Sequence, residues 1–471
     1  MRGWVKLLCS VACSVLLVPI CGFAPDLSQK IGADVIVTAA PSYSPLAALQ
    51  GGERFPKGAQ LLFVHEGKAA PLIAGFAASA DANVSFDGQK VLFAGKKLAG
   101  DPWQIWELTL ADRSVRQVTT GLADAIRPLY LPGWRLVYAL RTAKGFQLQS
   151  ARLVDSKALE EIEPAGSRAI LPLTYLNASA VPADVLADGR ILFEAGFPLG
   201  VGAIPELFLV YSDGSGVESY RCDHATIGPN GRGRWGGKQL ASGDVVFTQG
   251  AGLARFTSPL AHEERVAIPH YSEYAGEVAE TPSGAWLLSA RESENAKFAL
   301  RLWKPGAASL ETVLARNDDL VEPVVIASRE RPRRHPSALH DWDYANLLAL
   351  DARVSRDGAL KGTPASVRLE TQDAAGHAVV IGTAPVEADG SFFVKAPADQ
   401  AIRFALLDAS GAVLRKERGW FWIRRGEQRY CVGCHAGPER ASENRVPAVL
   451  LRTTTPVDLT GTAQHSMPGG N

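Results

Sequence analysis

The chain has 471 residues, of which 46% are hydrophobic and 21% charged, a globular composition too long for a single core. Its 49 basic residues balance its 49 acidic residues, so the zero net charge argues against nucleic acid or an anionic membrane surface as a partner. With 45 glycines and 29 prolines, turns should be frequent and long helices few.

The N-terminal end has the layout of a secretory signal. Arg2 and Lys6 precede an apolar run, Leu7 to Ile20, which is short for a membrane span. We expect cleavage after Ala24 and a periplasmic or secreted protein. The alternative is a lipoprotein attached to the membrane through Cys21, although the residues before Cys21 lack the small side chain expected there.

The cysteines divide into two sets. Half of the six lie in the signal, and the mature chain keeps Cys222, Cys431 and Cys434. An odd number in an exported protein argues against a disulfide framework and reserves the close pair for other chemistry. We interpret Cys222 and the neighbouring His224 as a buried thiol and a loop histidine, with metal binding as the alternative.

A loose repeat runs from about residue 55 to residue 335. Its unit is a polar or proline residue plus glycine, followed by a short β-rich run, and its glycines recur every 41 to 56 residues. This period matches one four-stranded propeller blade, so the region predicts a closed six-bladed β-propeller in which the first and last strands share a blade. The alternative is a pair of β-sandwiches. The turn glycines are Gly88, Gly133, Gly189, Gly243 and Gly284.

A second all-β region follows a Pro- and Arg-rich linker at Arg329 to Pro336. The segment from about residue 345 to residue 408 holds five strand candidates with turns between them, which suits a small β-sandwich. The polar segment after Gly437 lacks periodicity and should run over the surface.

Residues 431–435 have the spacing C-x-x-C-H, the attachment motif of haem c. Two thiols about one helical turn apart meet the two vinyl groups, and the adjacent histidine reaches the iron. We therefore predict one covalent haem c held by Cys431 and Cys434, with His435 as the proximal iron ligand. A zinc site would need two further ligands at matching spacing, and a thioredoxin-like pair would need an α/β unit.

The flanks of this motif offer further candidates. Met467, followed by proline, is the distal iron ligand candidate, with His465 nearby and an exposed tail as the alternative. Trp420 to Trp422 could cover a haem, and Arg424, Arg425 and Arg429 could pair with propionates. They could equally be sandwich-core aromatics and solvated charges.

Nearly all of the mature chain resembles a known family, most strongly between about residue 385 and residue 450. The segments 385–392, 406–409 and 426–429, then the C-x-x-C-H motif and 444–447, are similar to proteins related to the hydrazine synthase alpha subunit. The resemblance implies a propeller, a middle domain and haem c. That enzyme's catalytic haem uses a tyrosine shortly after the motif and diverts the motif histidine to zinc. Here Ala436 to Ser442 contains no tyrosine and the chain has one haem motif, so His435 is expected to keep its ordinary role.

Three functions follow. The first is a mono-haem electron carrier or redox subunit with a redox partner protein. The second is a haem enzyme acting on a small nitrogen or oxygen species, and the third is a propeller scaffold with a structural haem. The expected parts are a signal peptide at 1–24, the propeller at 25–338, the β-sandwich at 339–426, and the haem c-binding segment and tail at 427–471.

Overall fold

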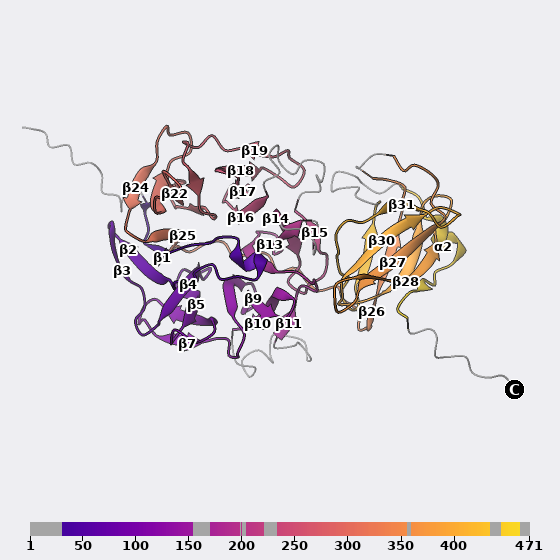
Figure 1. Ribbon diagram of the computed structural model, residues 1–471, viewed down its shortest axis with the longest axis horizontal. Coiled ribbons are helices and arrows are strands. Elements are labelled where there is room, and N and C mark those ends of the chain that lie inside the picture. The colour runs from indigo at the N-terminus through magenta and orange to yellow at the C-terminus, as the bar shows by residue number, and fades with distance from the viewer. Residues whose placement is uncertain are drawn as a thin grey trace, which may run out of the picture.

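The computed structural model describes residues 31–153, 170–197, 199, 204–220, 233–355, 359–433 and 444–461. Nearly all regular structure is β: six sheets form one body and two sheets form a second body beside it (Figure 1). The sequence prediction of an all-β chain is confirmed. No helix among the described residues is long and apolar enough to cross a membrane.

The six sheets of the first body are the blades of a propeller. Blade 1 has the order β25 (Asp319–Val325), β1 (Val35–Ala40), β2 (Gln60–His65) and β3 (Lys68–Pro71). Blade 2 consists of β4 (Ala78–Val84), β5 (Lys90–Lys96), β6 (Gln104–Thr109) and β7 (Val115–Gln117). Blade 3 consists of β8 (Ala125–Leu131), β9 (Arg135–Thr142), β10 (Gly145–Arg152) and β11 (Ile170–Pro172). Blade 4 consists of β12 (Ala180–Val185), β13 (Ile191–Phe197), β14 (Ile204–Val210) and β15 (Glu218–Ser219).

Blades 5 and 6 complete the ring. Blade 5 consists of β16 (Arg234–Gln239), β17 (Val245–Gln249), β18 (Gly252–Phe256) and β19 (Glu264–Arg265). Blade 6 consists of β20 (Glu273–Tyr274), β22 (Trp286–Arg291), β23 (Ala299–Trp303) and β24 (Glu311–Leu314), and β21 (Ala279–Glu280) also pairs with β22. A short 3₁₀ helix, η1 (Ala47–Gln50), lies between β1 and β2.

The ring closes as the repeat predicts. β25, the last strand of the propeller, pairs antiparallel with β1, the first, so no open sheet edge remains between the two ends. Each of the five turn glycines precedes the second strand of blades 2 to 6 and has a positive φ of 74° to 91°. A side chain there would be strained, which is why glycine recurs at this point of the unit. β1 was not predicted from the sequence.

The second body is the expected β-sandwich. One sheet has the order β32 (Gln428–Cys431), β26 (Tyr344–Ala349), β29 (Phe392–Pro397) and β33 (Val457–Asp458). The other has the order β28 (Ala378–Pro385), β27 (Ser366–Gln372), β30 (Ile402–Leu407) and β31 (Val413–Lys416). A short helix, α2 (Ala448–Arg452), packs outside them. The domain boundaries stay predictions, but β32 and β33, beyond residue 426, both pair within this sandwich.

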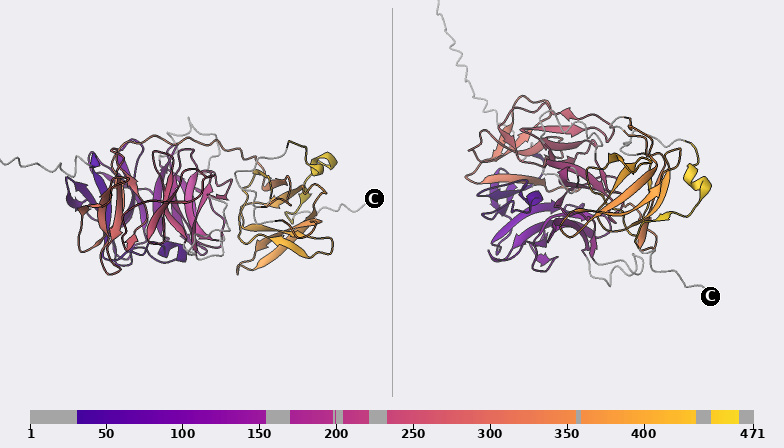
Figure 2. Two further views of the ribbon diagram at one scale, coloured as in Figure 1. Left: turned by 90° about the horizontal axis from the view of Figure 1, so that it is seen from above. Right: turned by 45° about the vertical axis from the view of Figure 1, so that its right-hand side comes forward.

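The two bodies lie side by side and are joined by a linker, residues 326–343 (Figure 2). The linker is fixed to the propeller: the Arg329 amide donates to the Phe86 carbonyl at 2.9 Å, and the Arg333 amide donates to the Ala187 carbonyl at 3.0 Å. It therefore passes from blade 2 to blade 4 along the turns that precede the second strands.

Candidate functional site

Cys431, the first residue of the C-x-x-C-H motif, is the last residue of β32. This edge strand runs parallel to β26, with Ala349 opposite Cys431. The Cys431 side chain is partly buried and packs against the sandwich core, as Phe421 does. Burial raises the pKa of the Cys431 thiol, and the neighbouring Arg429 guanidinium opposes that shift. The first thiol of the motif is thus held on a paired strand at the edge of an apolar core.

The backbone on both sides of residues 434–443 is anchored at the same corner of the sandwich. The Leu350 amide donates to the Cys431 carbonyl at 2.8 Å, and a Cβ on Gly433 would lie 2.9 Å from the Val354 carbonyl oxygen. On the far side, Arg445 Nη2 donates to the Leu350 carbonyl at 3.2 Å. Close contact with the 351–354 loop is therefore sufficient to require glycine at position 433, independently of any contact with a porphyrin.

Asp389 completes this corner. It forms an ion pair with Arg445 and accepts the Ala448 amide at 2.8 Å and the Ser391 hydroxyl at 2.6 Å. Burial alone would raise the pKa of Asp389, but these donors outweigh it and lower that pKa. Asp389 and Arg445 belong to two separated stretches that carried the family resemblance, and the fold brings them together beside Cys431.

Several predicted residues lie outside the described part of the chain. These are the signal with Cys21, the pair Cys222 and His224, the remaining motif residues Cys434 and His435, and the distal candidates His465 and Met467. Their roles stay predictions. Within the described ranges no cluster of three or more His, Cys, Asp or Glu side chains could hold a metal ion.

The aromatic and basic flanks mainly join the two bodies. Trp420 and Trp422 are buried in a cluster with blades 3 and 4, and Trp422 Nε1 donates to the Gly214 carbonyl at 2.8 Å. Arg424 is buried, pairs with Asp399 at 2.6 Å and donates to the Asp213 carbonyl at 2.9 Å. The Arg424 guanidinium is thus not solvated, and its bonds to Asp399 and Asp213 occupy the donors that a haem propionate would need.

A second concentration of charge, which the sequence did not reveal, lies on the propeller axis. The strand that stands at the inner end of each blade, which is β25 in blade 1, β4 in blade 2 and β8 in blade 3, meets its neighbours there. In these three strands the pairing register shifts at a bulge. The bulge residues Asp81, Arg127 and Glu322 have φ of 60°, 55° and 55°, a left-handed conformation that non-glycine residues rarely adopt. The only sequence feature that could have pointed to these bulges is that Arg127 and Glu322 each precede a proline.

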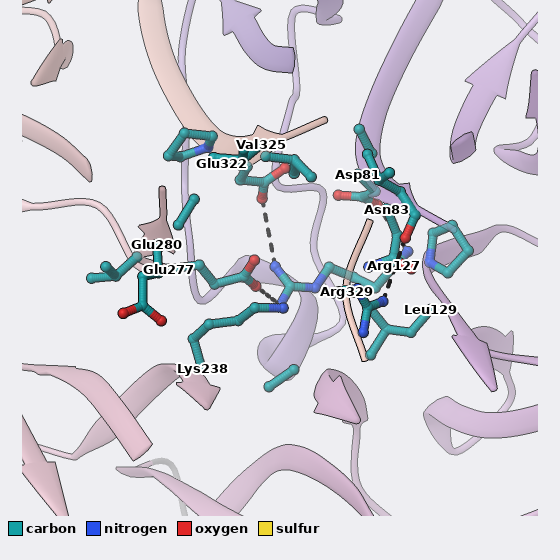
Figure 3. Close-up of a pocket in the computed structure, with 18 of the residues that line it drawn as sticks. Asp81, Asn83, Arg127, Leu129, Lys238, Glu277, Glu280, Glu322, Val325 and Arg329 are labelled. Atoms are coloured by element: carbon teal, nitrogen blue, oxygen red, sulfur yellow. Dashed lines mark hydrogen bonds and ion pairs between the residues drawn. The ribbon is translucent and has the colours of Figure 1, made fainter. Parts of the chain in front are cut away.

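These axial side chains pair with one another. Arg127 reaches between Glu277 and Glu322 beside a cavity of about 130 Å³ (Figure 3). Arg54 pairs with Asp81 and lies 2.6 Å from Glu322 Oε1. The network therefore connects blades 1, 2, 3 and 6 across the axis.

Burial sets the proton affinity of the network. Burial raises the pKa of Glu322 to about 7, and the neighbouring Arg54 only partly opposes the shift. Burial also raises the pKa of Glu194, which accepts the Gly236 amide at 2.6 Å. Because its charged groups are already paired, we interpret the network as the structural closure of the ring.

Together these features define a class of protein: a six-bladed propeller followed by a β-sandwich whose edge strand leads into a C-x-x-C-H motif. Residues 347–436 match the family described as the hydrazine synthase alpha subunit middle domain. The whole fold is similar to hydrazine synthase from Kuenenia stuttgartiensis, with a TM-score of 0.76 and 17% identity, covering 89% of this chain and 71% of that chain. The resemblance found in the sequence is confirmed.

The propeller also has a solved structure of similar fold outside that family. TolB from Acinetobacter baumannii has a TM-score of 0.45 and 11% identity, covering 63% of this chain and 67% of that chain. No curated protein is significantly similar in sequence.

Proposed function

We propose that this chain is an exported, mono-haem c-type protein that transfers electrons to or from a redox partner protein. The observation that carries the proposal is the C-x-x-C-H motif that starts at Cys431, on a strand held at the edge of the sandwich. When bound, haem c supplies one-electron redox chemistry. The predicted export signal supports the proposal, because covalent haem attachment in bacteria takes place outside the cytoplasm.

The described residues fit a covalently held group. Cys431 packs against the apolar core of the sandwich, which suits a porphyrin edge, and Arg429 places a cation beside it. The described residues on either side, Gly433 and Arg445, are both held against the 350–354 segment of the sandwich. We propose His435 as the proximal ligand and Met467 as the distal candidate.

The alternative function is a haem enzyme with an open iron position for a small nitrogen or oxygen species. The family match at residues 347–436 favours it, because the matched family is named for an enzyme subunit. Coordination separates the two: a six-coordinate low-spin spectrum supports electron transfer, and a high-spin spectrum supports catalysis.

The test is haem retention in acid–acetone, which extracts only non-covalent haem. Wild type should retain haem, and the double variant Cys431→Ala, Cys434→Ala should lose it, while Cys222→Ala, the matched control, should retain it. His435→Ala should shift or broaden the Soret band. Haem that extracts freely from the wild type would overturn the proposal. Mass spectrometry of the mature N-terminus tests export, which a protein starting at Met1 would contradict.

A further inference from the structure

A cleft of about 410 Å³ lies between the propeller, the linker and the sandwich. Its size is that of a small-molecule site, and domain interfaces are preferred places for such sites. Arginines dominate its described lining: Arg135, Arg333, Arg334, Arg424 and Arg425 face three aspartates, Asp213, Asp341 and Asp399. The described lining therefore carries an excess of two positive charges.

Two of these arginines have guanidinium groups that bond to no other described residue. Arg333, in the linker, and Arg425, in the segment before β32, form hydrogen bonds only through their backbone amides. Both side chains are exposed. Arg424, in contrast, is committed to Asp399. The guanidinium groups of these two residues, which come from different parts of the fold, are thus available to a ligand in the cleft.

The backbone at both arginines is fixed. The Arg333 amide donates to Ala187 O at 3.0 Å, and a Cβ on Gly189 would lie 2.0 Å from the Arg333 carbonyl oxygen, so the linker is pressed onto blade 4. The Arg425 amide donates to Asp399 Oδ1 at 3.1 Å, and Asp399 has a left-handed φ of 58°. Strained residues persist where their surroundings hold them, often beside binding sites. Fixed backbones with uncommitted cations reduce the ordering cost of binding an anion.

We propose that this cleft binds a small organic dianion whose two anionic groups pair with Arg333 and Arg425. A monoanion would leave one guanidinium without a partner, and the three aspartates oppose a larger polyanion. Leu131, Pro132 and Trp342 supply apolar wall for a short carbon body. The site is separate from Cys431 and does not depend on the proposed haem.

Isothermal titration calorimetry of the full mature chain tests this with two organic dianions as probes, succinate for dicarboxylates and ethane-1,2-disulfonate for disulfonates. Binding of either supports the dianion site and identifies its source, and acetate should bind much more weakly. Arg333→Gln and Arg425→Gln should each weaken binding about tenfold or more, as expected for the loss of one charge-assisted pair. The affinity should fall as salt is added.

Arg418→Gln is the matched control, because Arg418 is an exposed arginine in the same connection as Arg425 but outside the cleft. It should leave affinity unchanged. Urea unfolding midpoints equal to wild type would show that the cleft variants fold. Failure of both probes to bind the wild type, or equal losses in Arg425→Gln and Arg418→Gln, would overturn the proposal. Because haem retention is not read out, this failure is distinguishable from failure of the proposed function.

Discussion

Replacing Glu322 by Gln should remove a pH dependence from the stability of the propeller. Glu322 lies on β25, the strand that closes the ring, and its side chain is 5% exposed. It accepts the Thr38 hydroxyl at 3.5 Å and lies 2.6 Å from Arg54 Nη2. Burial raises its pKa from 4.5 to about 7, so the native carboxyl keeps its proton to higher pH than the unfolded one.

The sign follows from proton linkage. Between about pH 4.5 and 7 the unfolded chain has released this proton and the folded chain still holds it, so stability falls as pH rises through that window. Below the window both states are protonated, and above it both are ionised. A shift of this size corresponds to at most about 3 kcal/mol. Glutamine stays neutral at every pH, and Arg54 and Arg127 keep Asp81 and Glu277 as partners.

The assay is urea unfolding of wild type, Glu322→Gln and Glu330→Gln at about pH 5 and about pH 7.5, on either side of most of this window. Wild type should lose stability at the higher pH, and Glu322→Gln should lose less. Glu330, an exposed linker carboxylate, is the control and should behave as wild type. Comparison between variants cancels the titration of the histidines. Equal losses in wild type and Glu322→Gln would refute the reasoning.

Three further predictions concern the packing around the linker and the motif. Gly189→Ala should cost about 2 kcal/mol more in urea unfolding than Gly243→Ala, because both have φ near +90° but only the added Cβ at Gly189 meets the linker; equal costs would contradict the linker contact. Arg424→Ala removes the buried guanidinium that pairs with Asp399 and donates to the Asp213 carbonyl, so it should cost about 3 kcal/mol in urea unfolding, and an unchanged midpoint would contradict its role at the interface. Asp389→Ala should lower the yield of covalently bound haem, which pyridine haemochrome spectra measure, and an unchanged yield would contradict its anchoring role.

The sequence predicts the blades because their signal is local. Each of the five turn glycines needs a positive φ set by the hairpin itself, so turn chemistry and strand propensity agree within a few residues. The strands that escaped prediction depend on distant partners. β33 has only two residues and exists because it pairs with β29, more than sixty residues earlier. β32 likewise gains its place from β26.

The axial charges could not be predicted from the sequence for the same reason. Asp81, Arg127 and Glu322 lie within strands of otherwise ordinary β pattern, and a left-handed conformation at a charged residue is stable only with its tertiary partners. The C-x-x-C-H motif is the opposite case, because the prediction of haem attachment rests on spacing along the chain alone. Composition alone could not show that Trp422 and Arg424 pack between the propeller and the sandwich. Contact with a haem would use the same residue types, aromatic rings and arginines.

The interface has a consequence for the motif that follows it. Glu427 accepts the Arg424 amide at 2.8 Å and the Gly216 amide at 3.3 Å, and Arg429 donates to the Val217 carbonyl. Both residues lie within the few positions that precede Cys431, so blade 4 and the sandwich together fix the start of the motif. Displacing blade 4 would move the strand that carries the first thiol, so the propeller edge would help to set the surroundings of the proposed haem.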